Sequence, residues 1–152
     1  MEFIPIAEAN CYITTIGQWV IDEAISALLR WREHGAVDEY FTVAVNVASA
    51  QLMQAHFADD LIAKMQQSGL PMHALELEVT ESDLMQDMQL AVQQLQCLAA
   101  AGLRIAIDDF GTGYSSLAYL KVLPVAVIKI DRTFISEMHV NTQDQRLTST
   151  VI

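Results

Sequence analysis

The sequence predicts an α/β fold in which parallel strands alternate with helices. Short apolar segments typical of strands recur along the chain, and the intervals between them carry apolar residues at helical spacing. Strands that alternate with helices in this way pair in parallel through right-handed crossovers. The residues alone leave open whether the sheet stays open or closes into a barrel. The predicted strands are 41–47, 75–79, the run that begins at 104, and 125–130.

The first part of the chain carries one long helical pattern. It opens with the segment FIPIAE (3–8), where Pro5 favours an extended or turned backbone over a helix. Apolar residues then recur at helical spacing up to Gly35, which supplies a stop. Trp19 and Trp31 both fall on this apolar stripe, so we expect them to pack against the core.

Further helices are predicted between and after the strands. They are expected at 51–68, with a break near 56–59, at 83–101, at 117–120 and from 144 onward. Cys97 lies in one of these patterns beside Leu95 and Leu98, which predicts a buried, reduced thiol. Cys11 and Cys97 lack the spacing of zinc ligands, and an intracellular protein fits them better than a disulfide.

The chain is acidic, with 8 basic and 19 acidic residues and a net charge of −11. Such a surface repels duplex nucleic acid and offers no basic groove for a single strand. It would also repel a phosphate ligand unless bound divalent cations reversed the local charge. The charge therefore favours metal-assisted phosphate chemistry, although an acidic surface without any such ligand has the same composition. No apolar run reaches the roughly 18 residues of a membrane span.

The stretch RIAIDDFGTGYSS (104–116) is the centre of the predicted site. Its apolar strand ends in two adjacent carboxylates, Asp108 and Asp109, which a glycine-rich loop follows at once. Paired acids delivered into such a loop suit a hard cation such as Mg²⁺, Mn²⁺ or Ca²⁺. The glycines let the backbone turn sharply and approach a ligand closely. The loop residues are Gly111, Gly113, Tyr114 and Ser115.

Each predicted strand places one polar residue near its C-terminal end, and strict alternation puts these residues on one side. The residues that share this side are Asn46, Glu78, Asp108 and Lys129. Taken alone, Asn46 is better explained as a strand-end asparagine that bonds its own backbone, but four coincident residues are harder to dismiss. Alternation sends Asp109 the other way unless the strand ends or bends there, as Gly111 suggests. The C-terminal end of a parallel barrel is where catalytic groups lie.

Five segments of the chain resemble the EAL-domain family of cyclic-di-GMP phosphodiesterases. They are FIPIAE (3–8), VNVASAQL (45–52), LELEVTES (75–82), DDFGTGYSSL (108–117) and IKIDRTFI (128–135). They follow the family's order with its approximate spacing and span nearly the whole chain. The resemblance implies a partial TIM-type (β/α) barrel that lacks the first strand region and the C-terminal units. We therefore expect residues 1–152 to form a single, incomplete EAL domain.

The resemblance also implies a two-metal site for Mg²⁺ or Mn²⁺. Asn46, Glu78 and Asp108 match family positions that coordinate the first metal, and Asp108 and Asp109 match the acidic pair that brings in the second. Lys129 matches the lysine that orients the nucleophilic water. The implied catalytic residues are Lys129, Asp108, Asp109 and Glu78.

Other positions match residues around this implied site. Glu81 matches a glutamate that supports the FGTGYSS loop, to which Gly111, Gly113 and Ser115 belong. Phe110 and Tyr114 could wall a nucleotide pocket, but aromatic residues beside a strand end are more often packing. Glu8 could lie at the mouth of the pocket or be a solvated surface acid.

The implied activity is the hydrolysis of cyclic di-GMP to the linear dinucleotide pGpG in bacterial second-messenger signalling. The alternative is a cyclic-di-GMP receptor that binds without turnover, as degenerate members of the family do. Because the family's name-giving glutamate motif and its downstream acidic motif have no counterpart here, we expect the chain alone to be poorly active. We expect a cytoplasmic location, and the sequence leaves open both a homodimer and membrane tethering through segments outside this chain.

Overall fold

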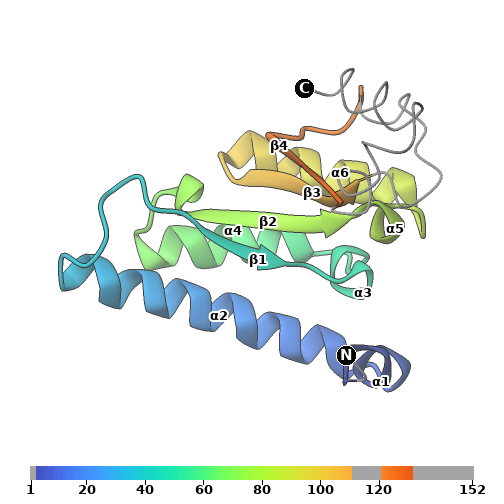
Figure 1. The fold of residues 1–152 in the computed structure, drawn as a ribbon, viewed down its shortest axis with the longest axis horizontal. Coiled ribbons are helices and arrows are strands. Elements are labelled where there is room, and N and C mark those ends of the chain that lie inside the picture. The colour runs from blue at the N-terminus through green and yellow to red at the C-terminus, as the bar shows by residue number, and fades with distance from the viewer. Residues whose placement is uncertain (1–2, 111–120, 132–152) are drawn as a thin grey trace, which may run out of the picture.

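The computed structural model describes residues 3–110 and 121–131, which form a parallel sheet with helices on one face (Figure 1). The strands are β1 (Val43–Asn46), β2 (Leu75–Thr80), β3 (Arg104–Phe110) and β4 (Val127–Ile130). They pair in the order β1-β2-β3-β4, and every pairing is parallel. The predicted α/β fold with parallel strands is therefore confirmed.

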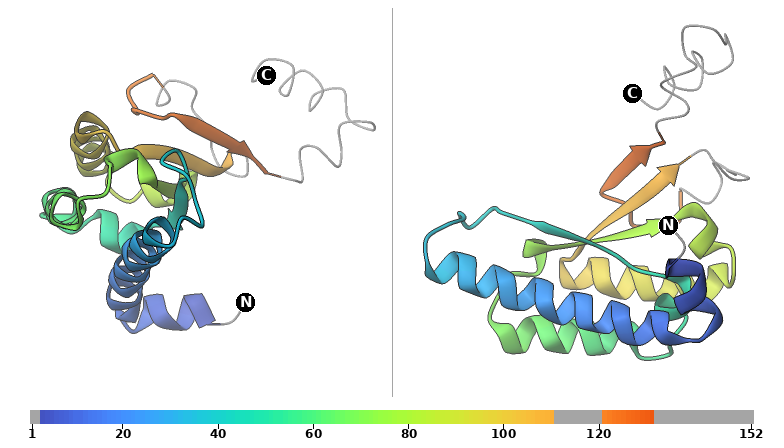
Figure 2. Two further views of the ribbon diagram at one scale, coloured as in Figure 1. Left: turned by 90° about the vertical axis from the view of Figure 1, so that its left-hand side faces the viewer. Right: turned by 60° about the horizontal axis from the view of Figure 1, so that its bottom comes forward.

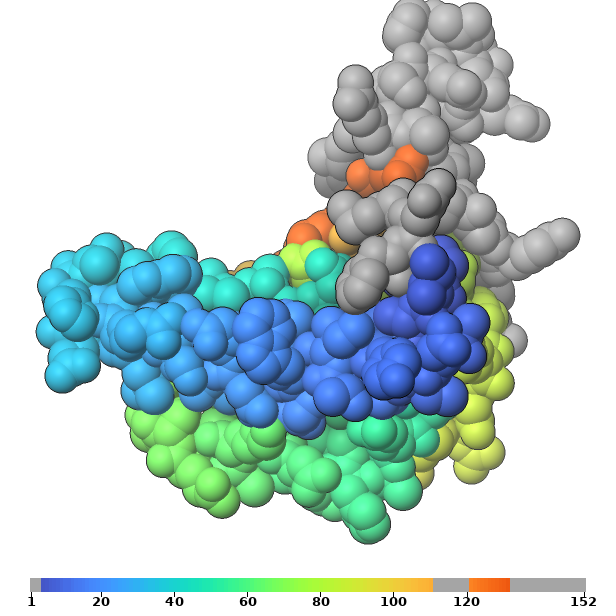
Figure 3. All heavy atoms as spheres, turned by 90° about the horizontal axis from the view of Figure 1, so that it is seen from below, coloured from blue at the N-terminus to red at the C-terminus, as the bar shows by residue number. Residues whose placement is uncertain are grey.

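The helices α2, α4 and α6 lie side by side against one face of the sheet (Figure 2). Figure 3 shows this helical side of the molecule, where α2 runs across the whole view beside α4. The helices are α1 (Phe3–Ala9), α2 (Tyr12–Glu33), α3 (Ser49–Leu52), α4 (Phe57–Ser68), α5 (Glu81–Leu84) and α6 (Met88–Ala101), with a 3-10 turn, η1 (Met72–Ala74), before β2. The described part of the chain contains no helix that is both long and apolar enough to cross a membrane.

The hydrophobic core fills the space between the sheet and the three long helices. On β2 the alternate residues Leu75, Leu77 and Val79 are buried against the helices, so the residues between them face the other side. The same alternation buries Ile105 and Ile107 of β3. The largest buried side chains from the helices include Ile21, Leu28, Leu52, Met65, Leu95 and Leu98.

The N-terminal segment and two local predictions differ from the structure. Residues 3–8 lie in helix α1, because Pro5 falls in its first turn, where a missing N–H leaves no helical bond unmade. Trp19 is 64% exposed, because the buried residues of α2 nearest to it are Gly17 and Ile21 and Trp19 points away from that face of the helix. Trp31 packs edge-on against Phe41 at the surface. Cys97 is exposed because it lies outside the buried stripe of α6.

The second helical region is broken as predicted, but between α3 and α4 at residues 53–56 and not at 56–59, and one buried polar side chain contacts this break. Gln94 of α6 lies in the core, where its Nε2 donates to the carbonyls of Gln54 and Ala55 at 2.8 and 3.3 Å. Its Oε1 accepts the backbone N–H of Ala58 at 3.0 Å. Gln94 thus satisfies backbone groups that the turn between α3 and α4 leaves without helical partners.

This contact predicts an unequal effect of alanine at two neighbouring glutamines. Gln94→Ala should lower the free energy of unfolding by about 2 kcal/mol, because the buried N–H of Ala58 loses its acceptor and the partly buried carbonyls of Gln54 and Ala55 lose a donor. Gln93→Ala is the matched control, since Gln93 is exposed on the same helix and should change stability by less than about 0.5 kcal/mol. Urea titration followed by circular dichroism measures both values, and equal effects would contradict this account.

Candidate functional site

The register of the strands places the predicted site residues on one face, at the C-terminal end of the sheet. Asn46 pairs directly with Glu78, and Glu78 pairs with Ala106, two residues before Asp108 on the same face of β3. All three lie on the side away from the buried residues of β2. Strand pairing therefore brings together side chains that are far apart in the sequence.

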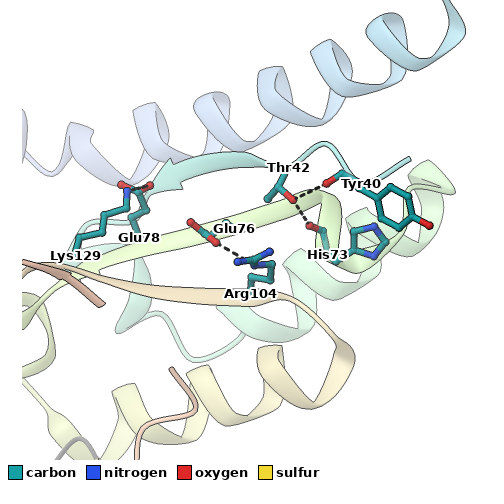
Figure 4. A network of polar contacts seen from close by, with 7 residues as sticks. All are labelled: Tyr40, Thr42, His73, Glu76, Glu78, Arg104 and Lys129. Carbon is teal, nitrogen blue, oxygen red and sulfur yellow. Dashed lines mark hydrogen bonds and ion pairs between the residues drawn. The ribbon is translucent and has the colours of Figure 1, made fainter. Parts of the chain in front are cut away.

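Lys129 reaches this face from β4 and forms an ion pair with Glu78 (Figure 4). The Glu78 side chain is buried, at 8% exposed, whereas Lys129 keeps 38% of its side chain in solvent. The hydrogen bond to Glu78 raises the pKa of Lys129; the charges of Glu78, Asp108 and Glu76 add to this, and burial opposes it. Lys129 therefore holds its proton firmly and supplies a cation inside a cluster of carboxylates.

A bulge in β3 brings Asp109 to the site. Ile107 pairs with Ile128 and Phe110 with Ile130, so Asp108 and Asp109 together oppose the single residue Lys129. Asp109 has a φ of 52°, in the left-handed region that aspartate tolerates better than most residues. A bulge re-aims the side chain, so strict alternation no longer sends Asp109 towards the helices. The predicted bend thus occurs within the strand itself, at Asp109.

The carboxylates at this edge repel one another. Desolvation raises the pKa of Asp109, and so do the negative charge of Asp108, the charge of Asp131 and a hydrogen bond with Asp131. The Asp109 backbone N–H also donates to Oδ1 of Asp108 at 3.0 Å, which holds the two residues together. A bound cation would relieve this repulsion.

Asp131 was missed by the sequence reasoning, although a signal for it exists. It follows β4 directly and lies two residues after Lys129, so period-two alternation assigns both to the same face. Its backbone N–H donates to the carbonyl of Phe110 at 3.5 Å. The acidic group at the end of β3 and β4 therefore has a third carboxylate.

A second ion pair occupies the same face farther towards the N-terminal ends of the strands. Nε of Arg104 lies 3.1 Å from Oε2 of Glu76, its direct partner across β2 and β3 (Figure 4). Thr42 and His73 lie beyond this pair, where the Thr42 hydroxyl donates to the His73 carbonyl at 3.0 Å. Basic and acidic groups thus compensate one another at this end, whereas acids predominate at the other.

The loop after β2 begins with a capping box that the sequence reasoning also missed. The Asp83 backbone N–H donates to Oγ1 of Thr80, and Oδ2 of Asp83 accepts the Thr80 N–H at 3.1 Å and its hydroxyl at 2.6 Å. The spacing of a threonine and an acidic residue three positions later is the usual sign of this motif. Glu81, predicted to support the glycine loop, is buried at the start of α5.

The other predicted positions fall into two groups. Helix α1, which carries the exposed Glu8, lies at the end of the molecule towards which β1 and β2 point (Figure 1). Phe110 ends β3 and packs partly against the core. The loop residues Gly111, Gly113, Tyr114 and Ser115 lie outside the described residues.

The donor chemistry of this edge fits a hard divalent cation, although its geometry does not yet enclose one. Asn46, Glu78, Asp108 and Asp109 offer only oxygen ligands, which Mg²⁺ and Mn²⁺ prefer. Among the described residues, no three acidic, histidine or cysteine side chains are arranged to hold a metal. Lys129 forms an ion pair with Oε1 of Glu78, one of the candidate metal ligands.

The ion pair between Glu78 and Lys129 makes a testable prediction about stability. We expect a double-mutant cycle of Glu78→Gln and Lys129→Met to give a coupling free energy of about 1 kcal/mol, because the carboxylate is buried but the lysine is half exposed. Urea denaturation of the four chains gives the value. Lys121→Met, at an exposed lysine, is the control and should show no coupling with Glu78→Gln. A zero value for the Lys129 cycle would contradict the pairing.

Comparison with known proteins gives a consistent result. The sequence profile of the EAL domain matches residues 1–152. The bifunctional diguanylate cyclase/cyclic di-GMP phosphodiesterase MucR of Pseudomonas aeruginosa is 40% identical over 151 residues, which are 99% of this chain and 22% of MucR. The cyclic di-GMP phosphodiesterase NbdA of the same organism is 39% identical, over 99% of this chain and 19% of NbdA. The chain thus spans about a fifth of the length of these relatives.

A solved structure shows the same arrangement of elements. The PaMucR phosphodiesterase in complex with c-di-GMP superimposes with a TM-score of 0.85 at 41% sequence identity, and the match covers 98% of this chain and 60% of that chain. The predicted partial TIM-type barrel is confirmed, because the four parallel strands match part of a barrel-like fold. The chain belongs to the EAL domain family.

Proposed function

We propose that these residues form part of a metal-dependent phosphodiesterase that hydrolyses cyclic di-GMP to the linear dinucleotide pGpG in bacterial signalling. The observation that carries the proposal is the strand register, which brings Asn46, Glu78 and Asp108 to one edge beside Lys129. The substrate class is supported by MucR and NbdA, whose names include cyclic di-GMP phosphodiesterase.

In this proposal the oxygen ligands hold two divalent cations, Mg²⁺ or Mn²⁺. Asn46, Glu78 and Asp108 would hold the first, and Asp108 with Asp109 the second. When bound, such ions make hydroxide available near neutral pH and neutralise charge on a phosphate undergoing in-line displacement. The raised pKa of Asp109 supports this assignment, because crowded carboxylates are stabilised by a cation.

Lys129 would act on the reacting groups themselves. Its ammonium group lies on the same face as the acids and holds its proton firmly. Released from Glu78, it can orient the attacking water and stabilise negative charge that develops on the phosphate. Hydrolysis then breaks one phosphodiester P–O bond and leaves a phosphate on one nucleotide and a hydroxyl on the other.

The remaining proposed roles concern the substrate and the glycine loop. Glu81 would support the loop that contains Gly111, Gly113 and Ser115, and its burial beside the C-terminal end of β2 agrees with such a role. Glu8, Phe110 and Tyr114 are proposed to contact the nucleotide. The position of α1 at the same end of the molecule supports the choice of Glu8.

The central prediction is that the two aspartates of the bulge are required for hydrolysis. The test uses a chimera in which this chain replaces the matching part of the PaMucR phosphodiesterase, whose remaining residues complete the barrel. Asp108→Asn with Asp109→Asn should lower turnover of cyclic di-GMP by at least about 10³-fold, because both metals lose a ligand. The double variant should still fold, since it loses like-charge repulsion along with its hydrogen bonds.

Product formation is followed by chromatography with Mn²⁺, and again after EDTA, which should abolish turnover. Full activity of the folded double variant would contradict the two-metal assignment. Tight binding of cyclic di-GMP by the unsubstituted chimera without turnover would instead favour a receptor. The 152-residue chain is assayed in parallel, and we expect it to turn over more slowly than the chimera.

A further inference from the structure

One carboxylate ties together the two loops that follow β1 and β2. Oδ1 of Asp83 accepts the backbone N–H of Ser49 at 3.1 Å, while its Oδ2 accepts both the N–H and the hydroxyl of Thr80. Ser49 lies three residues after Asn46, and Thr80 lies two residues after Glu78. The three donors therefore come from just beyond two proposed metal ligands.

A second contact closes the link between these loops. The backbone N–H of Val47 donates to the carbonyl of Glu78 at 2.9 Å, one residue beyond the paired Asn46 and Glu78. From Asn46 to Ser49, the chain is thus fastened to β2 and its loop at two points. These bonds continue the pairing of β1 and β2 past the end of the regular ladder.

The short helices α3 and α5 need such an external tie. Each contains four residues, which is too few for a helix to be stable by itself. The contacts with Asp83 are charge-assisted, and such hydrogen bonds are stronger than neutral ones. A partly buried carboxylate with three donors is also fixed in its own orientation. Asp83 can therefore transmit the position of one loop to the other.

We propose that Asp83 is a positioning residue that sets the separation of Asn46 and Glu78 for metal binding. This inference rests on the metal role proposed above, in which both side chains are ligands. Asp83 itself points into the loops and acts through backbone groups. Its loss should leave both ligands in place but let the loop after β1 move relative to β2.

The simpler explanation is that Asp83 only caps α5, and Asp87 offers a matched control. Asp87 also stabilises the start of its own helix, as the N-cap residue of α6 whose Oδ1 accepts the backbone N–H of Leu90 at 3.1 Å, whereas Asp83 is the third residue of α5 and accepts from the N-cap residue Thr80. Among the described contacts of Asp87, none reaches the loop after β1. If capping were the whole role of Asp83, then Asp83→Ala, like Asp87→Ala, would loosen only the start of its own helix and leave the loop after β1 unchanged.

The first measurement needs no metal. Amide hydrogen exchange of the chain is followed by NMR at Val47, whose N–H bonds to Glu78. Asp83→Ala should make this amide exchange faster, because the loop opens locally, whereas Asp87→Ala should leave it unchanged. Unchanged protection of Val47 in folded Asp83→Ala would overturn the inference whatever the metal does. If the alanine variant fails to fold, Asp83→Asn takes its place, since it keeps the shape and one acceptor oxygen.

The second measurement is the affinity of the chain for Mn²⁺, by calorimetry or electron paramagnetic resonance. Asp83→Ala should weaken binding about tenfold, the usual effect of removing a group that orients metal ligands, while Asp87→Ala should not. Equal affinities for the wild-type and Asp83→Ala chains would overturn the positioning role and leave the proposed metal site intact. If the chain alone does not bind Mn²⁺, the same variants are compared in the PaMucR chimera, and absence of Mn²⁺ binding by the unsubstituted chimera would overturn the metal site, and this inference with it.

A proline substitution removes the other half of the contact. Ser49 is the first residue of α3, where proline is tolerated, and the preceding Ala48 has φ −71° and ψ 150°, a conformation compatible with a following proline. Ser49→Pro should weaken Mn²⁺ binding as Asp83→Ala does, because it deletes the donated N–H. In the Asp83→Ala background it should have little further effect. Fully additive losses would show that the two residues act independently and would overturn the proposal.

Discussion

The structure depends on the parallel pairing of β2 with a neighbour on each side. This strand alternates strictly, with Leu75, Leu77 and Val79 against the helices and Glu76 and Glu78 on the other face. A shift of one residue in its register would bury the two glutamates in the hydrophobic core, at a large cost in desolvation. The same alternation that builds the core therefore fixes where the carboxylates lie. The register of β2 thus determines both which residues form the core and which residues form the candidate site.

The pairing of Glu78 with Lys129 follows from that constraint. A carboxylate that is 8% exposed needs a partner, and the lysine from β4 supplies one across the intervening strand β3. The pair contributes little net stability, because both groups lose hydration when they meet. Its value lies in holding the carboxylate of the proposed ligand in one orientation. In the proposed metal-bound state, a cation that took the Glu78 oxygen now bonded to Lys129 would free the ammonium group for a substrate.

The sequence was sufficient to predict what alternation and strand order determine. The parallel strands and the common face of Asn46, Glu78 and Lys129 follow from period-two patterns and agree with the observed register. Features set by local backbone geometry were less accessible. The bend at Asp109 was expected from the following glycine, yet it is a bulge defined by the pairing of β3 with β4. In the sequence, Gln94 and Asp83 look like ordinary helix residues, because their hydrogen-bond partners lie in other segments of the chain. Trp19 was expected in the core but is exposed, because the buried face of α2 is narrow.

The charge of the site connects metal binding with ligand binding. Asp108, Asp109 and Asp131 crowd the ends of β3 and β4, where desolvation and the charges of the other two carboxylates raise the pKa of Asp109. Because Lys129 is already bound to Glu78, this edge repels a phosphodiester when metal is absent. Two divalent cations would reverse the sign of the local field and release the lysine at the same time. Binding of an anionic ligand and binding of metal then favour each other, and by linkage each must raise the affinity for the other by the same factor. Through this coupling, the acidity of the chain, with a net charge of −11, is compatible with the proposed phosphate substrate.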